Sequence, residues 1–78
     1  MSDEPAEKTE LLKLITTALE LLPDDYRESF VLREYDGLSY QEIAEITNSS
    51  MATVKIRLFR AKQKIRDILA PYLADLAK

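Results

Sequence analysis

Residues 37–62 read GLSYQEIAEITNSSMATVKIRLFRAK, and the pattern of this stretch decides the fold. Ser39 followed three residues later by Glu42 is a capping box, in which a hydroxyl and a carboxylate satisfy free amides at a helix start. Asn48 then marks a tight turn, because asparagine adopts a left-handed backbone more readily than other residues that carry a side chain. A second helix follows this turn at once. The stretch therefore predicts a helix-turn-helix motif over about residues 39–69.

Two further helices are expected before the motif. Apolar residues recur at helical spacing between Leu11 and Leu22, and Pro23 ends this first helix because proline disfavours helical geometry in the residue before it. A second helix is expected over about residues 24–35, where two aspartates suit its positive N-terminal end. Gly37, the single glycine of the chain, is expected to stop this helix in a left-handed conformation.

The two helices of the motif are expected over about residues 40–47 and 51–69, and Pro71 is expected to end the second. In the shorter helix, Ile43 and Ile46 are expected to face inward. In the longer helix, one apolar stripe follows the 3.6-residue period and is expected to pack on the preceding helices; it comprises Met51, Val54, Leu58, Ala61, Ile65 and Ile68. The predicted fold is therefore all-α: a compact four-helix domain with a helix-turn-helix, in a three-helical DNA/RNA-binding core that is winged-helix-like but without the wing.

The length and composition of the chain restrict its class. Seventy-eight residues allow a single domain, 1–78, of which the polar residues 1–8 are expected to form a flexible tail. The sequence has no cysteine and no histidine, so neither a disulfide framework nor a metal site is expected, and no cofactor is implied. No apolar stretch is long enough for a membrane span, and the acidic start does not read as a signal peptide, which indicates a cytoplasmic protein.

An enzyme is not expected either. Carboxylates and tyrosines are plentiful, but none is accompanied by a histidine, a cysteine, a metal-ligand set or a glycine-rich phosphate loop.

Charge is distributed unevenly along the chain. The net charge is −3, yet residues 46–66 hold six bases and no acid, whereas residues 1–45 hold twelve acids and four bases. A local positive field of this kind neutralises phosphates. Two large apolar groups stand among the cations on the side of the last helix opposite its apolar stripe, where the residues are Lys55, Ile56, Phe59, Arg60, Gln63 and Lys64. This face is expected to lie in the major groove of DNA. The simpler alternatives are an ordinary solvated helix face, or burial of Phe59 beneath the chain around Tyr72 and Leu73.

The run LPDDYRESFVLREYDGLSYQEIAEI, residues 22–46, together with ATVKIRLFRAKQKIRDIL, residues 52–69, resembles region four of bacterial sigma factors, particularly the extracytoplasmic-function group of the sigma-seventy superfamily. The resemblance covers about residues 10–70. It implies a carboxy-terminal domain that docks on the flap of the RNA polymerase core and binds the promoter element near position −35 in transcription initiation. Sigma factors of this group also need an upstream domain, so the resemblance implies a fragment excised from a longer protein.

The resemblance also indicates which residues meet DNA. The recognition helix of the family meets bases at the positions of Lys55, Ile56, Phe59 and Arg60, a basic residue is usual at Arg57, and Tyr40 and Gln41 fall near the phosphate-contacting start of the supporting helix. With neighbouring polar positions, the expected DNA-binding residues are Tyr40, Gln41, Ser50, Thr53, Lys55, Ile56, Arg57, Phe59, Arg60, Gln63 and Lys64. The expected partners are promoter duplex DNA, the RNA polymerase core and an anti-sigma protein, and the isolated domain is expected to be monomeric.

Two other functions stay open from the sequence. A LuxR-type output domain of a response regulator shares a GLS-x-x-EIA element and a TVK start to its recognition helix, although the LPDDYRESFVLR segment favours a sigma factor. A helical module that contacts only proteins is the second, since the first 45 residues are strongly acidic. A dimer on symmetric half-sites would favour the former, and a lack of salt-dependent DNA binding would favour the latter.

Overall fold

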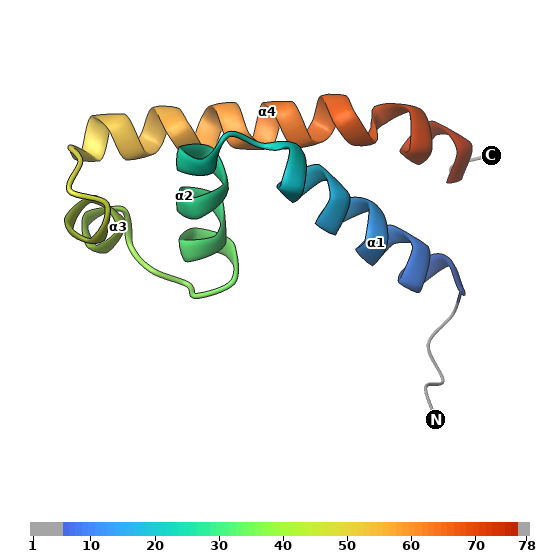
Figure 1. Cartoon of the computed structure of the whole chain (residues 1–78), viewed down its shortest axis with the longest axis horizontal. Helices are drawn as coiled ribbons and strands as arrows, with labels where there is room; N and C mark the ends of the chain where they lie inside the picture. Colours follow the sequence, from blue (N-terminus) through green and yellow to red (C-terminus); the bar gives the residue numbers. More distant parts are fainter. Residues whose placement is uncertain (1–5, 77–78) are drawn as a thin grey trace.

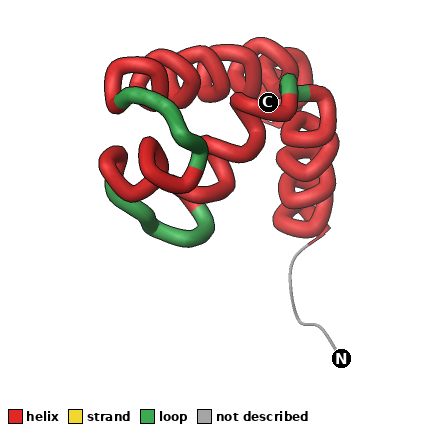
Figure 2. The backbone as a smooth tube through the Cα atoms, turned by 60° about the vertical axis from the view of Figure 1, so that its left-hand side comes forward, coloured by secondary structure: helices red, strands yellow, loops and turns green. Residues whose placement is uncertain are grey.

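The computed structural model describes the backbone of residues 6–76 and the side chains of residues 9–75. Its four helices follow one another as α1 Ala6–Leu21, α2 Asp24–Glu34, α3 Tyr40–Ile46 and α4 Met51–Leu76. α4 forms one long edge of the molecule; α2 and α3 pack beside its first half, and α1 packs beside its second half (Figure 1). Within the described residues the helices are joined by short loops and no strand occurs, as the turned view shows (Figure 2). The all-α prediction is confirmed.

Most helix boundaries lie close to the expected ones. α2 stops at Glu34 and α3 at Ile46, each one residue before its expected end. α1 begins at Ala6, inside the segment 1–8 that was expected to be a tail, and residues 1–5 lie outside the described part of the chain.

Pro71 does not end α4, which corrects the sequence-based prediction. The helix continues through the proline to Leu76, so the expected end at residue 69 and the short tail after it are wrong. Proline inside a helix removes one amide donor and costs about 3 kcal/mol. Asp67 and Pro71 are both exposed, so water is available to the Asp67 carbonyl that loses its helical donor.

The core lies where α2, α3 and the first half of α4 meet. Four side chains of α3 and α4 are buried there, with Leu32, Leu38 and Tyr40 packed against them: Ile43, Ala44, Val54 and Leu58. Farther along, Ala61 and Leu69 of α4 are buried, as is Ala18 of α1, which packs on α4. The short side chains of the two alanines allow helices to approach closely.

Two inward-facing predictions are wrong. Ile46 is 59% exposed and Met51 is 44% exposed, because both lie at helix ends beside the turn, where no neighbouring helix covers them. The one polar side chain among the buried described residues is Ser29 of α2, and its Oγ has no hydrogen-bond partner there.

The corner between α1 and α2 is closed by Arg27. Pro23 follows the first helix, and the last carbonyls of a helix lack amide donors. The Arg27 guanidinium supplies donors here: Nη2 donates to the carbonyls of Leu22 at 2.9 Å and Glu20 at 3.2 Å. Its Nε donates at 2.8 Å to the carbonyl of Leu19, which also accepts the Leu22 amide at 3.2 Å. Its Nη1 also donates to Asp24 Oδ1 at 3.1 Å. One side chain of α2 therefore caps the C-terminal end of α1 and fixes the angle between them.

Replacing Arg27 with methionine should destabilise the protein by about 2 kcal/mol, since hydrogen bonds from a charged donor contribute about 1.5 to 3 kcal/mol and the site is partly solvated. Urea denaturation followed by far-UV circular dichroism measures the loss. The stability of Arg27→Lys should fall between that of the parent protein and that of Arg27→Met. A lysine ammonium cannot reach all three carbonyls as the fixed fork of a guanidinium does. An unfolding midpoint for Arg27→Met equal to that of the parent protein would contradict this role.

The predicted capping box and both left-handed turns are present. Ser39 Oγ accepts a hydrogen bond from the Glu42 amide at 3.1 Å, and Glu42 Oε1 accepts one from the Ser39 amide at 2.9 Å. Gly37 has a φ of 69° and Asn48 a φ of 52°. The start of α3 and the turn into α4 are thus set by the residues that the sequence pattern singled out.

The Ser39 amide, followed by the Ser39 hydroxyl, holds the pKa of the Glu42 carboxyl below its ordinary value. A carboxyl with a lowered pKa in the folded state adds stability above its unfolded pKa, and this contribution disappears as the pH falls through the folded pKa. We therefore expect the unfolding free energy of the parent protein to fall in acid relative to that of Glu42→Gln, whose amide does not titrate. Denaturant titrations of both proteins from neutral to acidic pH test this, and a constant difference would show that Glu42 is not linked to folding.

Candidate nucleic-acid interface

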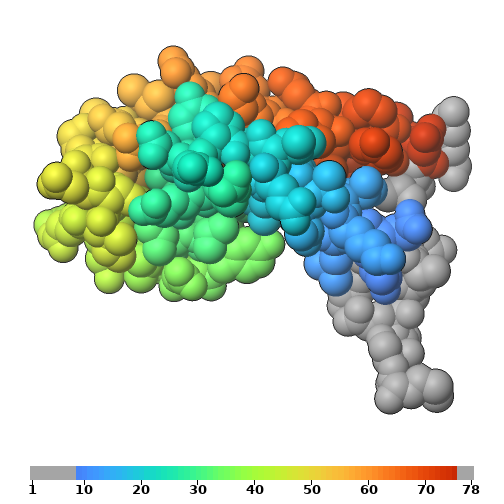
Figure 3. Space-filling view, viewed as in Figure 1, coloured from blue at the N-terminus to red at the C-terminus, as the bar shows by residue number. Residues whose placement is uncertain are grey.

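The first half of α4 presents its outer side to solvent. Val54, Leu58 and Ala61 are 0%, 4% and 0% exposed, which fixes the core-facing side of the helix. At 100° per residue, the opposite side carries exposed residues that include both predicted apolar contacts and their polar neighbours: Ile56, Phe59, Arg60 and Gln63. We call these four residues the outer face. Figure 3 shows α3 and the start of α4 together at one end of the molecule, with α1 at the other.

The outer face is not covered by the C-terminal part of the chain. Phe59 is 67% exposed, while Tyr72 and Leu73 are themselves 50% and 42% exposed. All three lie in one continuous helix, so Tyr72 stands about 20 Å along the axis from Phe59. The alternative in which Phe59 is buried beneath Tyr72 and Leu73 is therefore wrong.

The N-terminal end of α4 is suited to an anion. Ser50 Oγ accepts a hydrogen bond from the Thr53 amide at 3.0 Å and donates one to Thr53 Oγ1 at 2.9 Å, so Ser50 caps the helix. No acid stands in the first turn, in contrast to α3, which carries Glu42 there. Free amides and the positive end of the helix dipole attract phosphate, and no carboxylate competes for them.

The cations on the flanks of α4 are not equivalent. Lys62 Nζ lies 3.5 Å from Glu34 Oε1 and is engaged with α2. Lys55 Nζ lies 5.9 Å from the centroid of the Tyr40 ring, and Arg60 Nη1 makes a long 3.5 Å contact with Tyr26 Oη. Lys64 is exposed and has no ion-pair partner within the described part of the chain. Lys55, Arg60 and Lys64 are therefore free to reach a partner at little cost.

Arg57 is turned toward the protein. Its side chain is 22% exposed, Nη1 donates to Ser49 Oγ at 2.9 Å, and Nη2 lies 3.6 Å from Asp25 Oδ2 at the start of α2. This places Arg57 apart from the other predicted contact residues. It joins the turn of the helix-turn-helix to α2 and so holds α4 in register with the rest of the domain.

Replacing Arg57 with glutamine should lower the unfolding free energy by about 1 kcal/mol, because a hydrogen bond and a partly screened ion pair are both lost. Asp25→Asn should cost less than half as much, since its carboxylate is 71% exposed. Lys64→Gln is the matched control and should change stability by less than about 0.5 kcal/mol. Equal, near-zero effects of Arg57→Gln and Lys64→Gln in urea denaturation would refute the positioning role.

The two predicted residues of α3 differ in their surroundings. Tyr40 is half-buried against the core, with the Arg33 guanidinium 4.6 Å from its ring centroid and Lys55 on the same ring. Gln41 is exposed in the first turn of α3. Tyr40 therefore links α2, α3 and α4.

The structure thus brings Lys55, Ile56, Phe59, Arg60, Gln63 and Lys64 onto the exposed side of one helix, with Ser50 and Thr53 at its start. Sequence reasoning missed the contacts that orient this helix, which Asp25 and Ser49 make with Arg57. No local spacing links Asp25 to a residue 32 positions later. The opposite charges of Asp25 and Arg57 were the only signal.

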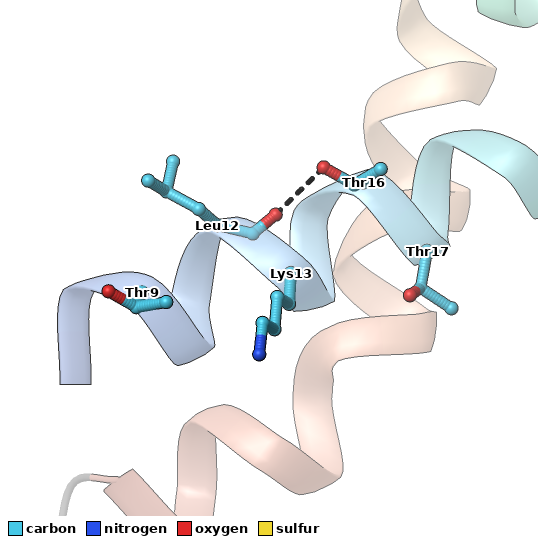
Figure 4. Close-up of a pocket in the computed structure, with 5 residues that line it drawn as sticks. All are labelled: Thr9, Leu12, Lys13, Thr16 and Thr17. Carbon is cyan, nitrogen blue, oxygen red and sulfur yellow. Dashed lines mark hydrogen bonds between the residues drawn. The ribbon is translucent and has the colours of Figure 1, made fainter. Parts of the chain in front are cut away.

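A shallow hollow of about 430 Å³ lies elsewhere, on α1, lined by Thr9, Leu12, Lys13, Thr16 and Thr17 (Figure 4). The Thr16 hydroxyl is already used, since it donates to the Leu12 carbonyl at 2.9 Å. The hollow contains one charged group and lies beside the far half of α4, so it is separate from the outer face.

The family model described as Sigma-70, region 4 matches residues 12–65 of the chain, which span α2, α3 and the whole outer face. The chain belongs to the sigma-70 region 4 family. It is 42% identical over 64 residues to proteins named ECF RNA polymerase sigma-E factor from Escherichia coli strain K12 and Salmonella typhimurium strain LT2. It is 37% identical over 65 residues to the protein of that name from Haemophilus influenzae.

These alignments cover 82% to 83% of the chain but 34% of each relative, so this region 4 chain spans about a third of the length of the relatives it matches. The resemblance to the extracytoplasmic-function sigma factors is confirmed, and with it the helical fold of region 4. Among the described helices, none is both long enough and apolar enough to cross a membrane.

Proposed function

We propose that this region 4 chain is the promoter-reading, carboxy-terminal domain of an extracytoplasmic-function sigma factor. It binds the minus-35 element of duplex DNA with the outer face of α4 while attached to the RNA polymerase core in the cytoplasm. The DNA-binding part of this proposal rests on one observation. The side chains of Ile56, Phe59, Arg60 and Gln63 are exposed on one side of α4, and Lys55 and Lys64 flank them. Relatives named RNA polymerase sigma factors support the attachment to polymerase.

The geometry suits a groove rather than a flat partner. A major groove is about 12 Å wide and admits one helix. Here the first half of α4 lies at one end of the molecule, away from α1 (Figure 3). In this proposal Arg60 donates two hydrogen bonds to a guanine, whereas Lys64 and the start of α4 at Ser50 contact phosphates. Arg57 contributes by positioning α4, since its guanidinium is engaged with Ser49 and Asp25.

The family match favours a sigma factor over a LuxR-type output domain. A salt titration of DNA binding distinguishes the proposed function from the other alternative, a module that contacts only proteins. If α4 binds DNA, the logarithm of the association constant falls linearly with the logarithm of salt concentration, and each phosphate contact adds about one unit to the slope. A protein-only module gives no such dependence.

Arg60→Ala and Lys64→Ala should weaken DNA binding in different ways. A duplex selected from a randomised pool by the parent protein, and a scrambled duplex of equal composition, are compared by fluorescence anisotropy at several salt concentrations. Arg60→Ala should cost about 1 to 3 kcal/mol on the selected duplex and reduce the preference for it. Lys64→Ala should weaken both duplexes alike and lower the salt slope by about one.

A charge-reversing control lies outside the outer face. Lys13→Glu changes an exposed cation on α1 by two charges and should leave the preference between the two duplexes unchanged. Equal losses on selected and scrambled DNA for both α4 variants would contradict the assigned roles.

A further inference from the structure

Ile56 and Phe59 form an apolar pair at the centre of the outer face. They are 52% and 67% exposed and stand three residues apart in α4, so their Cβ atoms are neighbours about 5 to 6 Å apart. Ile56 lies about 200° around the helix from the fully buried Val54, and therefore points directly away from the core. No described side chain of the protein covers this pair.

The surroundings of the pair restrict what can cover it. Lys55 and Arg60 flank it and Lys64 follows one turn later, all exposed. An apolar protein surface placed here would bury several cations without partners, which is costly. A polyanion that carries an apolar group in the middle of its surface satisfies both features. Duplex DNA is such a polyanion, because thymine exposes a C5-methyl group in the major groove between two rows of phosphates.

We propose that Ile56 and Phe59 recognise thymine methyl groups, so that the preferred site contains thymine where these side chains meet the groove floor. The inference rests on the proposed binding of duplex DNA by α4. Two effects favour thymine over cytosine. The methyl group of thymine packs on the side chain, and the N4 amino group of cytosine would find no acceptor on either residue. Base pairs follow one another every 3.4 Å, so the two methyl groups belong to neighbouring or next-neighbouring pairs.

Deoxyuridine tests the proposal because it differs from thymidine only by the C5-methyl group. Each thymine of the duplex selected by the parent protein is replaced singly by deoxyuridine, and the dissociation constant is measured by fluorescence anisotropy. We expect a loss of about threefold to fivefold at one or two positions within two base pairs of each other, the amount expected from one buried methyl group, and no change elsewhere.

Variants assign the two positions. Ile56→Ser should remove the deoxyuridine effect at one position and Phe59→Ser at the other, with far-UV circular dichroism confirming that each protein is folded. Leu12→Ser is the matched control, since Leu12 is 50% exposed on α1, and it should keep both effects. The parent protein alone provides the decisive measurement, so a variant that fails to fold leaves the test intact.

The outcomes separate this inference from the proposed function. If no duplex is bound with a salt-dependent affinity, the proposed function fails and the inference fails with it. If DNA is bound in a salt-dependent way but the selected site lacks thymine, or every deoxyuridine substitution is neutral, the methyl-recognition proposal alone is overturned.

Discussion

The structure depends on one stripe of α4, which has to bury apolar side chains against three other helices at once. Val54 and Leu58 meet α3 and α2, Ala61 continues the buried stripe, and Leu69 carries it into the half beside which α1 packs. A domain of this size has little apolar area to bury, so it cannot spare this side of the helix for anything else. The opposite side of α4 is left in solvent as a result, and every residue of the outer face owes its exposure to that constraint.

Local chemistry explains which parts of the fold were predictable. The Ser39–Glu42 capping box, Gly37 and Asn48 act within a few residues of themselves, and their predicted roles are all present. Pro71 misled because a helix tolerates proline where the orphaned carbonyl reaches water, and exposure depends on the tertiary structure. The burial of Ser29 was equally hidden, since its neighbours Phe30, Val31 and Leu32 are more apolar yet only partly buried. α2 lies among the other helices, so the burial of each of its side chains depends on how closely a neighbouring helix approaches it and not on its hydrophobicity.

The candidate interface was predictable as a set but not in its internal organisation. The run of bases from Lys55 to Arg66 identified the helix, and the 3.6-residue period identified its outer side. A count of charges treats all cations alike, however, whereas in the structure they differ in whether they have an ion-pair partner. Lys62 and Arg57 are engaged with carboxylates of α2, while Lys64 is without an ion-pair partner among the described residues. This division comes from pairs of residues far apart in sequence, which no local pattern reports.

The length of α4 has a mechanical consequence. Its 26 residues make a rod about 39 Å long, held by α1 toward one end and carrying the outer face toward the other. A tilt of only about 5° at the α1 end would swing the opposite tip by about 3 Å, as much as the full length of a hydrogen bond. Because α2 and α3 also pack on the first half of α4, such a tilt would have to carry the whole domain with it. In the proposed complex, a partner that binds α1 and the DNA that meets the outer face would therefore act on one rigid unit.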